Sequence, residues 1–599
     1  MKTRARPYNL NVRLKVLAAV LGCCGVVLVG RAAQMQLFNK DFYQHEGDAR
    51  FLREVPIATS RGMIMDRNGE PLAVSTPVES VWANPKELLQ HPERLPELAK
   101  ALGIPQDMLT QRIAQRSDKE FVFLRRHINP DDAQAVVARG IPGVYSQREF
   151  RRFYPHGEVM AHVLGFTNID DQGQEGVELA FNDWLTGKPG AQRVIRDRRG
   201  RIVENVDLVK AAQPGKDITL SIDRRIQYLA YRELKAALIS NGASSGSVVV
   251  LDIPTGEILA MVNQPSYNPN SRDAAEPGTH RNRAVTDVIE PGSTMKSMTV
   301  MAALENGVDP NITIDTNPGI IELGGYPIRD TTNHGVVTLT GLLQKSSNIA
   351  AAKLSLGMSD EHFYDVLHRF GFGQSTGSGF PGESSGVLAP ESAWSMVYKT
   401  RVAYGYGVSV TPLQLAQAYA AMANGGHLMP PTFIKGGAGQ GRQVMDPRIA
   451  KQVLTMLESV ITPQGSAPKA AVTGYHVAGK TGTSRISSGG GYLNKHVSLF
   501  AGIVPLDHPK FAMVVVINNP SGHDYYGGLV SAPVFHNVMD GALRLMDVPP
   551  DHVEQWLVKT PVAPVSAPAP EPEPEDVDPD TTAVAAAPAP AAAAPGGQR

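Results

Sequence analysis

The sequence predicts a multidomain α+β protein in which an antiparallel sheet has helices on its faces, preceded by one membrane-spanning helix. The chain has 599 residues, too many for a single hydrophobic core, so two or three domains are expected. After residue 245 the order is strands, a helical block, two further apolar strands and a last helix, which is typical of an α+β domain. An apolar run near the amino terminus predicts the membrane helix.

Composition excludes several functional classes. The chain has 57 Lys+Arg and 58 Asp+Glu residues, so no charge excess favours a nucleic-acid partner. Both cysteines, Cys23 and Cys24, lie in the first apolar run, and the rest of the chain therefore has neither disulfides nor thiolate metal ligands. No helical His-Glu-x-x-His motif is present. The sequence indicates no metal site and no organic cofactor.

The apolar run extends from Val16 to Gly30 and follows a basic segment. Residues 31–37 lengthen it into the interface, because Arg31 can extend its charged end toward water. We therefore predict a cytoplasmic basic tail over residues 1–15 and a signal anchor over residues 16–37, with the remaining chain on the outer side. The alternative is a cleaved signal peptide, but no clean small-x-small cleavage site follows the run.

Residues 50–215 are predicted to form a mixed α/β support domain, a pedestal. The segment Ser60–Ser75 is read as two strands joined at Asn68-Gly69, a combination typical of a hairpin turn. Helices are expected over Pro85–Leu102 and Pro130–Arg139. A strand from Asp217 to Asp223 and an amphipathic helix from Arg224 to Ile239 close the segment. We find no catalytic constellation in this region.

A second domain is predicted over residues 220–552. Two apolar strands, Val248–Asp252 and Glu257–Val262, flank a Pro-Thr-Gly turn. Two more follow far along the chain, at Val497–Val504 and Phe511–Asn518, and a final helix is expected over Pro533–Leu545. Because the strands are separated by a helical block, they predict an antiparallel sheet with helices on its faces.

Within that block, Glu-Pro-Gly precedes a helix predicted to begin at Ser293, and Lys296 follows three residues later. Residues three apart share a helix face. A serine at a helix start lies near unpaired N–H groups that favour developing negative charge, and a lysine with a lowered pKa can accept its proton. The plainer interpretation is a capping serine beside an exposed lysine. A second Ser-x-x-Lys, Ser466 to Lys469, contains Pro468 and is read as a loop.

Two further stretches favour the catalytic interpretation of Ser293 and Lys296 over the capping interpretation. Ser346-Ser-Asn348 interrupts a helical region, where a hydroxyl and an amide can face a cavity or can simply cap a helix. Lys480-Thr481-Gly482 occurs once, on a predicted strand whose glycines allow another backbone or a ligand to approach closely. Each motif is weak by itself.

The ordered set Ser-x-x-Lys, Ser-x-Asn and Lys-Thr-Gly resembles that of the penicillin-recognising serine enzymes. Around it, Arg61-Gly-x-Ile-x-Asp-Arg-Asn-Gly69, Arg152-x-Tyr-Pro155 and Gly173-x-x-Gly-x-Glu178 resemble the pedestal motifs of class B penicillin-binding proteins. The context of the motifs is most similar to the division-specific, FtsI-type subgroup. The resemblance covers about residues 10 to 550.

This resemblance implies a peptidoglycan D,D-transpeptidase in the inner membrane, with its catalytic domain in the periplasm at the division septum. Its substrates would be the D-Ala-D-Ala end of one stem peptide and an amine of another, its inhibitors β-lactams, and its partners the septal polymerase FtsW and other divisome membrane proteins. The implied catalytic residues are Ser293 as nucleophile, Lys296 as base, Ser346 as proton relay, Asn348 as the amide that holds the substrate backbone and Lys480 as the amine that keeps the site electropositive. The implied substrate-binding residues are Thr481, Gly482, Thr483, Tyr525 and Tyr526. The N–H groups of Ser293 and Thr483 would form the oxyanion hole.

Alternatives remain at this stage. A β-lactamase or β-lactam sensor shares the motifs, although the pedestal argues against it, and an elongation-type transpeptidase is the nearest neighbour within the family. A catalytically silent divisome scaffold is disfavoured because every motif residue is intact. The Gly-x-Ser-x-Gly stretches at 242–246 and 382–386 lack the strand–helix context of an esterase. Residues 560–599 are rich in proline and alanine, which predicts a disordered tail.

Overall fold

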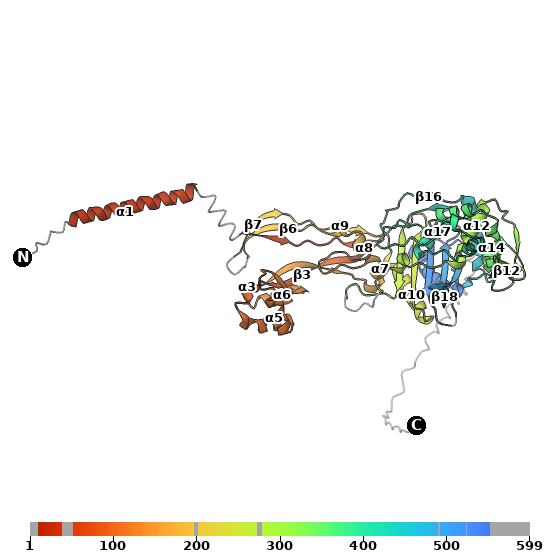
Figure 1. The fold of residues 1–599 in the computed structure, drawn as a ribbon, viewed down its shortest axis with the longest axis horizontal. Helices are drawn as coiled ribbons and strands as arrows, with labels where there is room; N and C mark the ends of the chain where they lie inside the picture. Colours follow the sequence, from red (N-terminus) through yellow and green to blue (C-terminus); the bar gives the residue numbers. More distant parts are fainter. Residues whose placement is uncertain are drawn as a thin grey trace, which may run out of the picture. The chain divides into compact units, whose positions relative to one another are not determined.

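The computed structural model describes residues 10–38, 52–196, 202–271, 278–488, 491–522 and 524–551. Residues 245–545 are built around one five-stranded antiparallel sheet (Figure 1). Its strand order is β10-β9-β19-β18-β17, which leaves β17 at one edge. The strands are β9 (Ser245–Asp252), β10 (Ile258–Gln264), β17 (Ala478–Ser488), β18 (Gly491–Val504) and β19 (Phe511–Asn518). The predicted antiparallel sheet is confirmed.

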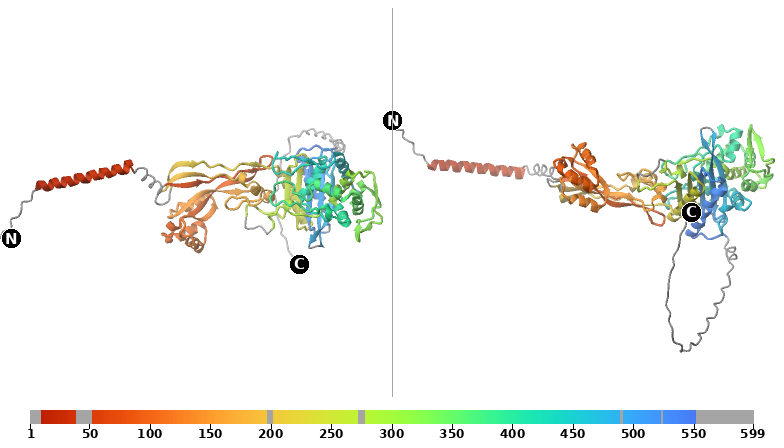
Figure 2. Two further views of the ribbon diagram at one scale, coloured as in Figure 1. Left: turned by 45° about the horizontal axis from the view of Figure 1, so that its top comes forward. Right: turned by 90° about the horizontal axis from the view of Figure 1, so that it is seen from below.

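Helices cover both faces of this sheet. Seven consecutive residues of β19, from Phe511 to Ile517, are buried, and because side chains of a strand alternate between faces, both faces of β19 must be covered. Helix α20 (Ala532–Leu545) and helix α17 (Pro412–Ala423) both contact β19. Helix α10 (Arg224–Ser240), predicted almost to the residue, packs on α20 and β10. Figure 2 shows the green helices gathered on one flank of the blue strands.

The pedestal contains two further sheets. Strands β1 (Leu52–Ile57), β6 (Gly190–Arg196) and β7 (Ile202–Lys210) form one. The other has the order β4-β3-β2-β8, with β5 also paired to β3. Its strands are β2 (Ile64–Met65), β3 (Pro71–Ala83), β4 (Val122–Ile128), β5 (Val144–Phe153) and β8 (Ile218–Thr219). The predicted hairpin at Asn68-Gly69 joins β2 to β3 as expected, and the second strand continues to Ala83.

Two pedestal predictions were wrong in extent. The helix expected over Pro85–Leu102 is three pieces, α3 (Pro85–Leu88), a 3-10 turn at Pro92–Arg94 and α4 (Leu95–Leu102). Pro92 explains the break, because proline disfavours helical conformation in the residue before it. The strand expected from Asp217 to Asp223 has only two ladder residues, those of β8.

A small lobe of the pedestal has its own core. It is built from α4, α5 (Gln106–Ala114), β4 and α6 (Pro130–Val137), whose apolar faces bury Leu98, Leu109, Ile113, Leu124 and Val136 among others. The base of the pedestal, in contrast, shares one continuous hydrophobic core with the sheet domain, since Ile64, Leu72 and Tyr154 belong to the same cluster as the residues of β9 and β19.

Helix α1 (Leu10–Ala33) lies near the amino terminus and continues as a π-helical turn over Gln34–Phe38. The helical stretch Leu10–Gln36 is long and apolar enough to span a membrane, and it includes Arg13 ahead of the apolar run. The tail predicted over residues 560–599 and most of the basic segment, residues 1–9, lie outside the described residues.

Candidate active site

Ser293 lies in a 3-10 turn (Gly292–Met295) that leads into helix α12 (Lys296–Glu305). The α-helix therefore begins three residues later than predicted. In a 3-10 turn the side chains of residues three apart eclipse one another, so this start brings Ser293 and Lys296 together. The amine of Lys296 donates a hydrogen bond of 3.0 Å to the Ser293 hydroxyl oxygen. Ser293 is half-buried, whereas Lys296 is fully buried.

Close backbone contacts fix this turn. Gly405 approaches it so tightly that a Cβ there would lie 1.9 Å from the carbonyl oxygen of Gly292. A Cβ on Gly482 would lie 2.9 Å from the carbonyl oxygen of Pro291, so strand β17 can reach the turn only because this residue is glycine. The buried hydroxyl of Tyr419 donates to the carbonyl of Thr294 over 2.8 Å. The turn that carries Ser293 is thus held by groups from three separate segments.

The Ser-x-Asn stretch forms the predicted helix break. Helix α13 (Leu339–Lys345) ends at Ser346, whose φ of 60° is left-handed, and α14 (Asn348–Leu356) begins two residues later. Asp330 caps the new helix by accepting hydrogen bonds from the Ser347 hydroxyl (2.6 Å) and the Asn348 N–H (2.5 Å). This aspartate was missed by sequence reasoning, because no motif or periodicity marks it.

Asn348 faces the lysine of α12. Its side-chain oxygen accepts a 2.7 Å hydrogen bond from the Lys296 amine, and its amide nitrogen donates to the carbonyl of Arg329 over 2.9 Å. An amide nitrogen has two hydrogens, so one N–H of Asn348 is left for another acceptor. Asn348 lines the same cavity as Ser293.

The Ser346 hydroxyl lies between the two lysines of the site. Its oxygen is 3.2 Å from the Lys296 amine and 2.9 Å from the amine of Lys480, which projects from β17. The Ser346 carbonyl also accepts from Lys296 over 2.6 Å. One hydroxyl therefore connects the two amines, and through Lys296 it connects with Ser293.

Both amines are completely buried, and no carboxylate within the described ranges forms an ion pair with either. Burial lowers the pKa of Lys480 to about 7. Burial, followed by the positive charge of Lys480, lowers the pKa of Lys296 well below its ordinary value, while Asp330 acts in the opposite direction. Desolvation disfavours the charged amine, so burial favours the neutral form of Lys296, the form that can accept a proton.

A cavity of about 450 Å³ opens above these groups. Ser466, outside the predicted site, reaches it and hydrogen-bonds the Thr481 hydroxyl at 2.9 Å, while Lys469 of the same Ser-x-x-Lys stretch is exposed. The rings of Tyr525 and Tyr526 stack with centroids 4.6 Å apart. Seven predicted site residues line the cavity, namely Ser293, Ser346, Asn348, Thr481, Thr483, Tyr525 and Tyr526.

Three predicted residues lie beneath the cavity wall instead. Lys296 and Lys480 are buried below it, and Gly482 provides the close approach of β17 described above. Strand β17 is an edge strand, and such a strand presents backbone N–H and C=O groups that its own sheet leaves unpaired. Within the part of the chain that the structure describes, no cluster of three or more His, Cys, Asp or Glu side chains is placed to hold a metal.

Comparisons with known proteins agree with this geometry. Residues 246–540 match the family model "Penicillin binding protein transpeptidase domain", and residues 56–220 match "Penicillin-binding Protein dimerisation domain". The chain is 45% identical to the peptidoglycan D,D-transpeptidase FtsI of Escherichia coli K12, over 88% of this chain and 92% of the relative. It is 39% identical to the probable peptidoglycan D,D-transpeptidase PenA of Neisseria gonorrhoeae, over 93% and 97% of the two chains.

Solved structures resemble the same regions. A peptidoglycan synthetase from Bifidobacterium adolescentis superposes with a TM-score of 0.66 at 27% identity, over 83% of this chain and 97% of the other. The isolated TP domain of Burkholderia pseudomallei penicillin-binding protein 3 matches at 41% identity with a TM-score of 0.51, over 55% of this chain and 97% of the other.

Proposed function

Because this chain belongs to the class B penicillin-binding proteins and is a serine-type peptidoglycan D,D-transpeptidase of the FtsI type, we propose that the residues around Ser293 divide its acyl transfer as follows. The neutral Lys296 amine takes the proton of Ser293 while the serine oxygen bonds to the carbonyl carbon of the penultimate D-alanine. The contact of 3.0 Å between the two side chains supports this step most directly.

The charge that develops on the carbonyl oxygen needs donors already in place. We assign these to the backbone N–H groups of Ser293 and Thr483, which lie on the nucleophile turn and the adjoining edge strand. A single donor of this kind contributes about 3 kcal/mol to transition-state stabilisation. Asn348, through its remaining amide hydrogen, would hold a backbone carbonyl of the donor peptide.

Collapse of the tetrahedral intermediate breaks the bond to the terminal D-alanine, whose nitrogen needs a proton. Ser346 would donate it, and the contacts of its hydroxyl with both lysine amines support this role. The proton that Lys296 took from Ser293 replaces the one donated. An amine of a second stem peptide then attacks the acyl-enzyme by the reverse path. The Thr481 and Thr483 hydroxyls would bind the terminal carboxylate, and the charged form of Lys480 would attract it.

The stacked pair Tyr525 and Tyr526 forms one wall of the cavity. Their rings offer a flat apolar surface to a substrate side chain. Gly482 contributes no side-chain contact, but its lack of a Cβ keeps β17 against the nucleophile turn. The site thus combines a base, a relay, an anion pocket and an apolar wall.

Helix α1 supports a membrane anchor, with its basic flank in the cytoplasm and the catalytic domain in the periplasm. The similarity to FtsI supports a septal role, and we extend it to FtsW and other divisome membrane proteins as partners. A fluorescent fusion at midcell is expected. A side-wall pattern would instead indicate an elongation enzyme.

The acyl-enzyme assignment is tested by mass spectrometry after incubation with a penicillin. We expect one adduct, on the peptide that contains Ser293, which persists for many minutes because a transpeptidase releases it slowly. Ser293→Ala should abolish the adduct. Ser466→Ala, a serine that lines the same cavity in a second Ser-x-x-Lys sequence, should retain it. Rapid release of hydrolysed penicillin would point to a β-lactamase.

A further inference from the structure

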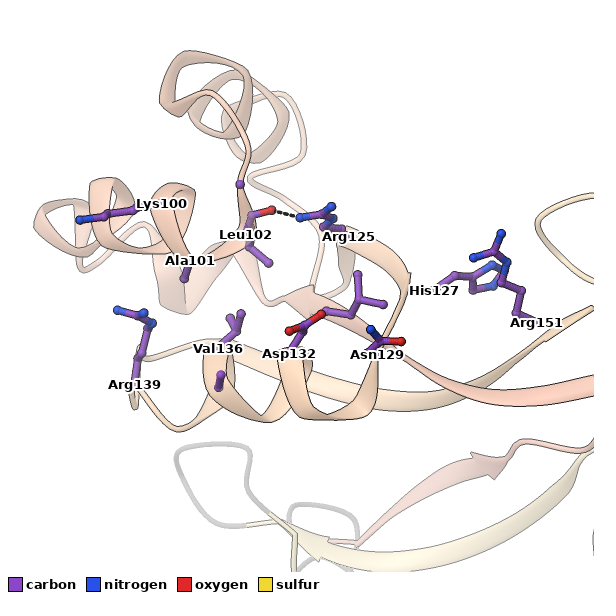
Figure 3. A pocket seen from close by; sticks show the side chains of 13 residues that line it. Lys100, Ala101, Leu102, Arg125, His127, Asn129, Asp132, Val136, Arg139 and Arg151 are labelled. Atoms are coloured by element: carbon purple, nitrogen blue, oxygen red, sulfur yellow. Dashed lines mark hydrogen bonds between the residues drawn. The ribbon is translucent and has the colours of Figure 1, made fainter. Parts of the chain in front are cut away.

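The pedestal lobe contains a groove of about 550 Å³, which is separate from the active-site residues (Figure 3). It lies between the carboxyl end of α4, strand β4 and helix α6. Apolar side chains form part of its floor: Ala101 and Ile128 are partly exposed, and Leu102 and Val136 are buried in the core of the lobe. The floor is therefore a fixed surface, formed by side chains that pack the lobe itself.

Four cations surround this floor, namely Lys100, Arg125, Arg139 and Arg151. The excess is local, because residues 84–151, which include all four cations, contain 11 lysines and arginines and nine aspartates and glutamates. The groove itself has a single lining carboxylate, Asp132. Asp132 also lies in the first turn of α6, where the helix dipole favours an acidic residue whatever binds in the groove.

Within the described residues, these cations are poorly neutralised. Lys100, Arg125 and Arg151 form no ion pair there, and Arg139 reaches only Glu97, at 3.5 Å and with both side chains about two-fifths exposed. The adjacent residue on the other side of β4 behaves differently: Arg126 contacts Glu149 at 2.8 Å and Asp170 at 2.7 Å. One strand thus has a neutralised arginine on one face and an un-neutralised one at the groove.

The charges are spread along the groove. Figure 3 shows Lys100 and Arg139 at one end, Arg151 at the other, and Arg125 and Asp132 between them. A single compact anion such as phosphate cannot contact both ends, and Asp132 would repel it from the middle. An extended polypeptide can place carboxylates at the two ends, an apolar side chain on the floor and a backbone N–H toward Asp132.

We propose that this groove binds a short acidic segment of another protein, with carboxylates on each side of an apolar residue. Charge complementarity attracts the segment, and the preformed floor limits the ordering that binding requires to the segment itself. The site lies outside the catalytic domain, so it concerns assembly of the enzyme with a partner and leaves acyl transfer unchanged.

The test uses the full chain in detergent micelles and fluorescence anisotropy. The probe is a fluorescein-labelled octapeptide with two glutamates on each side of a leucine–valine pair, and its matched control has glutamine in place of glutamate. We expect the glutamate peptide to bind at least tenfold more tightly, with an affinity that falls as salt is raised. Equal binding of the two peptides would overturn the proposal.

Two double variants test whether the peptide binds in the groove. Arg125→Glu with Arg139→Glu should raise the Kd of the glutamate peptide at least tenfold. Lys86→Glu with Lys119→Glu makes the same change of charge at exposed lysines of the lobe that lie outside the groove, and it should change the Kd less than threefold. Similar losses in both double variants would mean that only bulk charge matters.

A third variant leaves every cation in place. Ala135→Trp fills the groove from an exposed position of α6 and should also raise the Kd at least tenfold, whereas unchanged binding would exclude the groove. Penicillin acylation of Ser293 should stay within twofold in all variants. Two results would replace the proposed partner: binding to phosphatidylglycerol vesicles that depends on Arg125 and Arg139, or self-association of the chain that the arginine variants abolish.

Discussion

The pedestal and the catalytic domain each contain a pair of buried cations. The two pairs differ in the group that contacts both of their members. In the pedestal, Arg61 and Arg152 are each 2.6 Å from a different carboxylate oxygen of Glu178, which is fully buried. In the catalytic domain, Lys296 and Lys480 share the hydroxyl of Ser346. A carboxylate occupies the centre of the first cluster, and a neutral hydroxyl occupies the centre of the second.

The residue type of the two cations and the group between them decide whether the cations keep their protons. Arginine keeps its proton at any physiological pH, so the pedestal pair needs Glu178 as a counter-charge, and the cluster becomes a fixed ionic link. Lysine can lose its proton when it is buried, and although Asp330 opposes that loss at Lys296, burial and the charge of Lys480 are the larger effects. Similar burial therefore accompanies a fixed ionic link in one domain and, in the other, an amine that can lose its proton.

The largest effect is expected when the active site receives a cation that cannot lose its proton. Lys296→Arg should lower the rate of Ser293 acylation by about 10³-fold, the size expected when a general base is removed. The rate is measured from the mass-spectrometric adduct over time. Arg61→Lys makes the opposite exchange in the pedestal. The Glu178 carboxylate keeps the introduced lysine protonated, so the rate of Ser293 acylation should stay within twofold of the native rate. An arginine variant at 296 that acylates within tenfold of the native rate would contradict the role of Lys296.

Removing the counter-charge of the pedestal should be the next largest effect. Glu178→Gln keeps the shape of the side chain but leaves two arginines buried with no carboxylate between them. We expect the free energy of unfolding to fall by about 3 kcal/mol, as measured by chemical denaturation. Glu120→Gln, which removes the partner of an exposed lysine, should change it by less than about 1 kcal/mol. A fall of less than about 1 kcal/mol in Glu178→Gln would mean that water or a movement of the side chains solvates the two arginines.

The third prediction concerns the charge of Lys480. Its pKa in the folded protein is lowered to about 7 by burial, so the amine is charged below pH 7 and becomes neutral as the pH rises through that value. The second-order rate of acylation by a penicillin, whose carboxylate this charge attracts, should fall by about tenfold between pH 6 and pH 8. The methyl ester of the same penicillin has no carboxylate and should lack this fall. Parallel profiles for acid and ester would assign the titration to another group.

The sequence predicted the parts of the site that depend on short spacing. Ser293 and Lys296 are three residues apart, so any helical turn places them on one face. Ser346, Asn348 and Lys480 belong to short motifs that can be recognised in the sequence. The sheet and its helices were also predicted, because β9 and β19 are long apolar runs and α10 is strongly amphipathic.

What the sequence did not show depends on contacts between distant segments. Asp330 caps α14 from a separate hairpin, and Ser466 reaches the cavity from a stretch that its proline predicts to be a loop. Arg61 and Glu178 are 117 positions apart, so their motifs were visible while their pairing was not. No periodicity links such residues, and only the packed chain brings them together.

The smallest effect is expected at Asp171, an acidic group of the pedestal that burial leaves poorly stabilised. Burial raises its pKa to about 6, against the lowering effect of Arg61, and one carboxylate oxygen has no hydrogen-bond partner among the described atoms.

Below about pH 4 the carboxyl is protonated in both the folded and the unfolded chain. As the pH rises to 6 the unfolded chain loses this proton first, so folding becomes less favourable, and above pH 6 the full cost remains. Asp171→Asn should therefore raise the free energy of unfolding at pH 7.5 by no more than about 3 kcal/mol, the ceiling set by a shift of about two pKa units, and by much less at pH 4.5. Asparagine also tolerates the left-handed backbone of this residue, whose φ is 60°. Urea denaturation at the two pH values measures the difference, and an equal gain at both would show that shape, not ionisation, limits stability at this position.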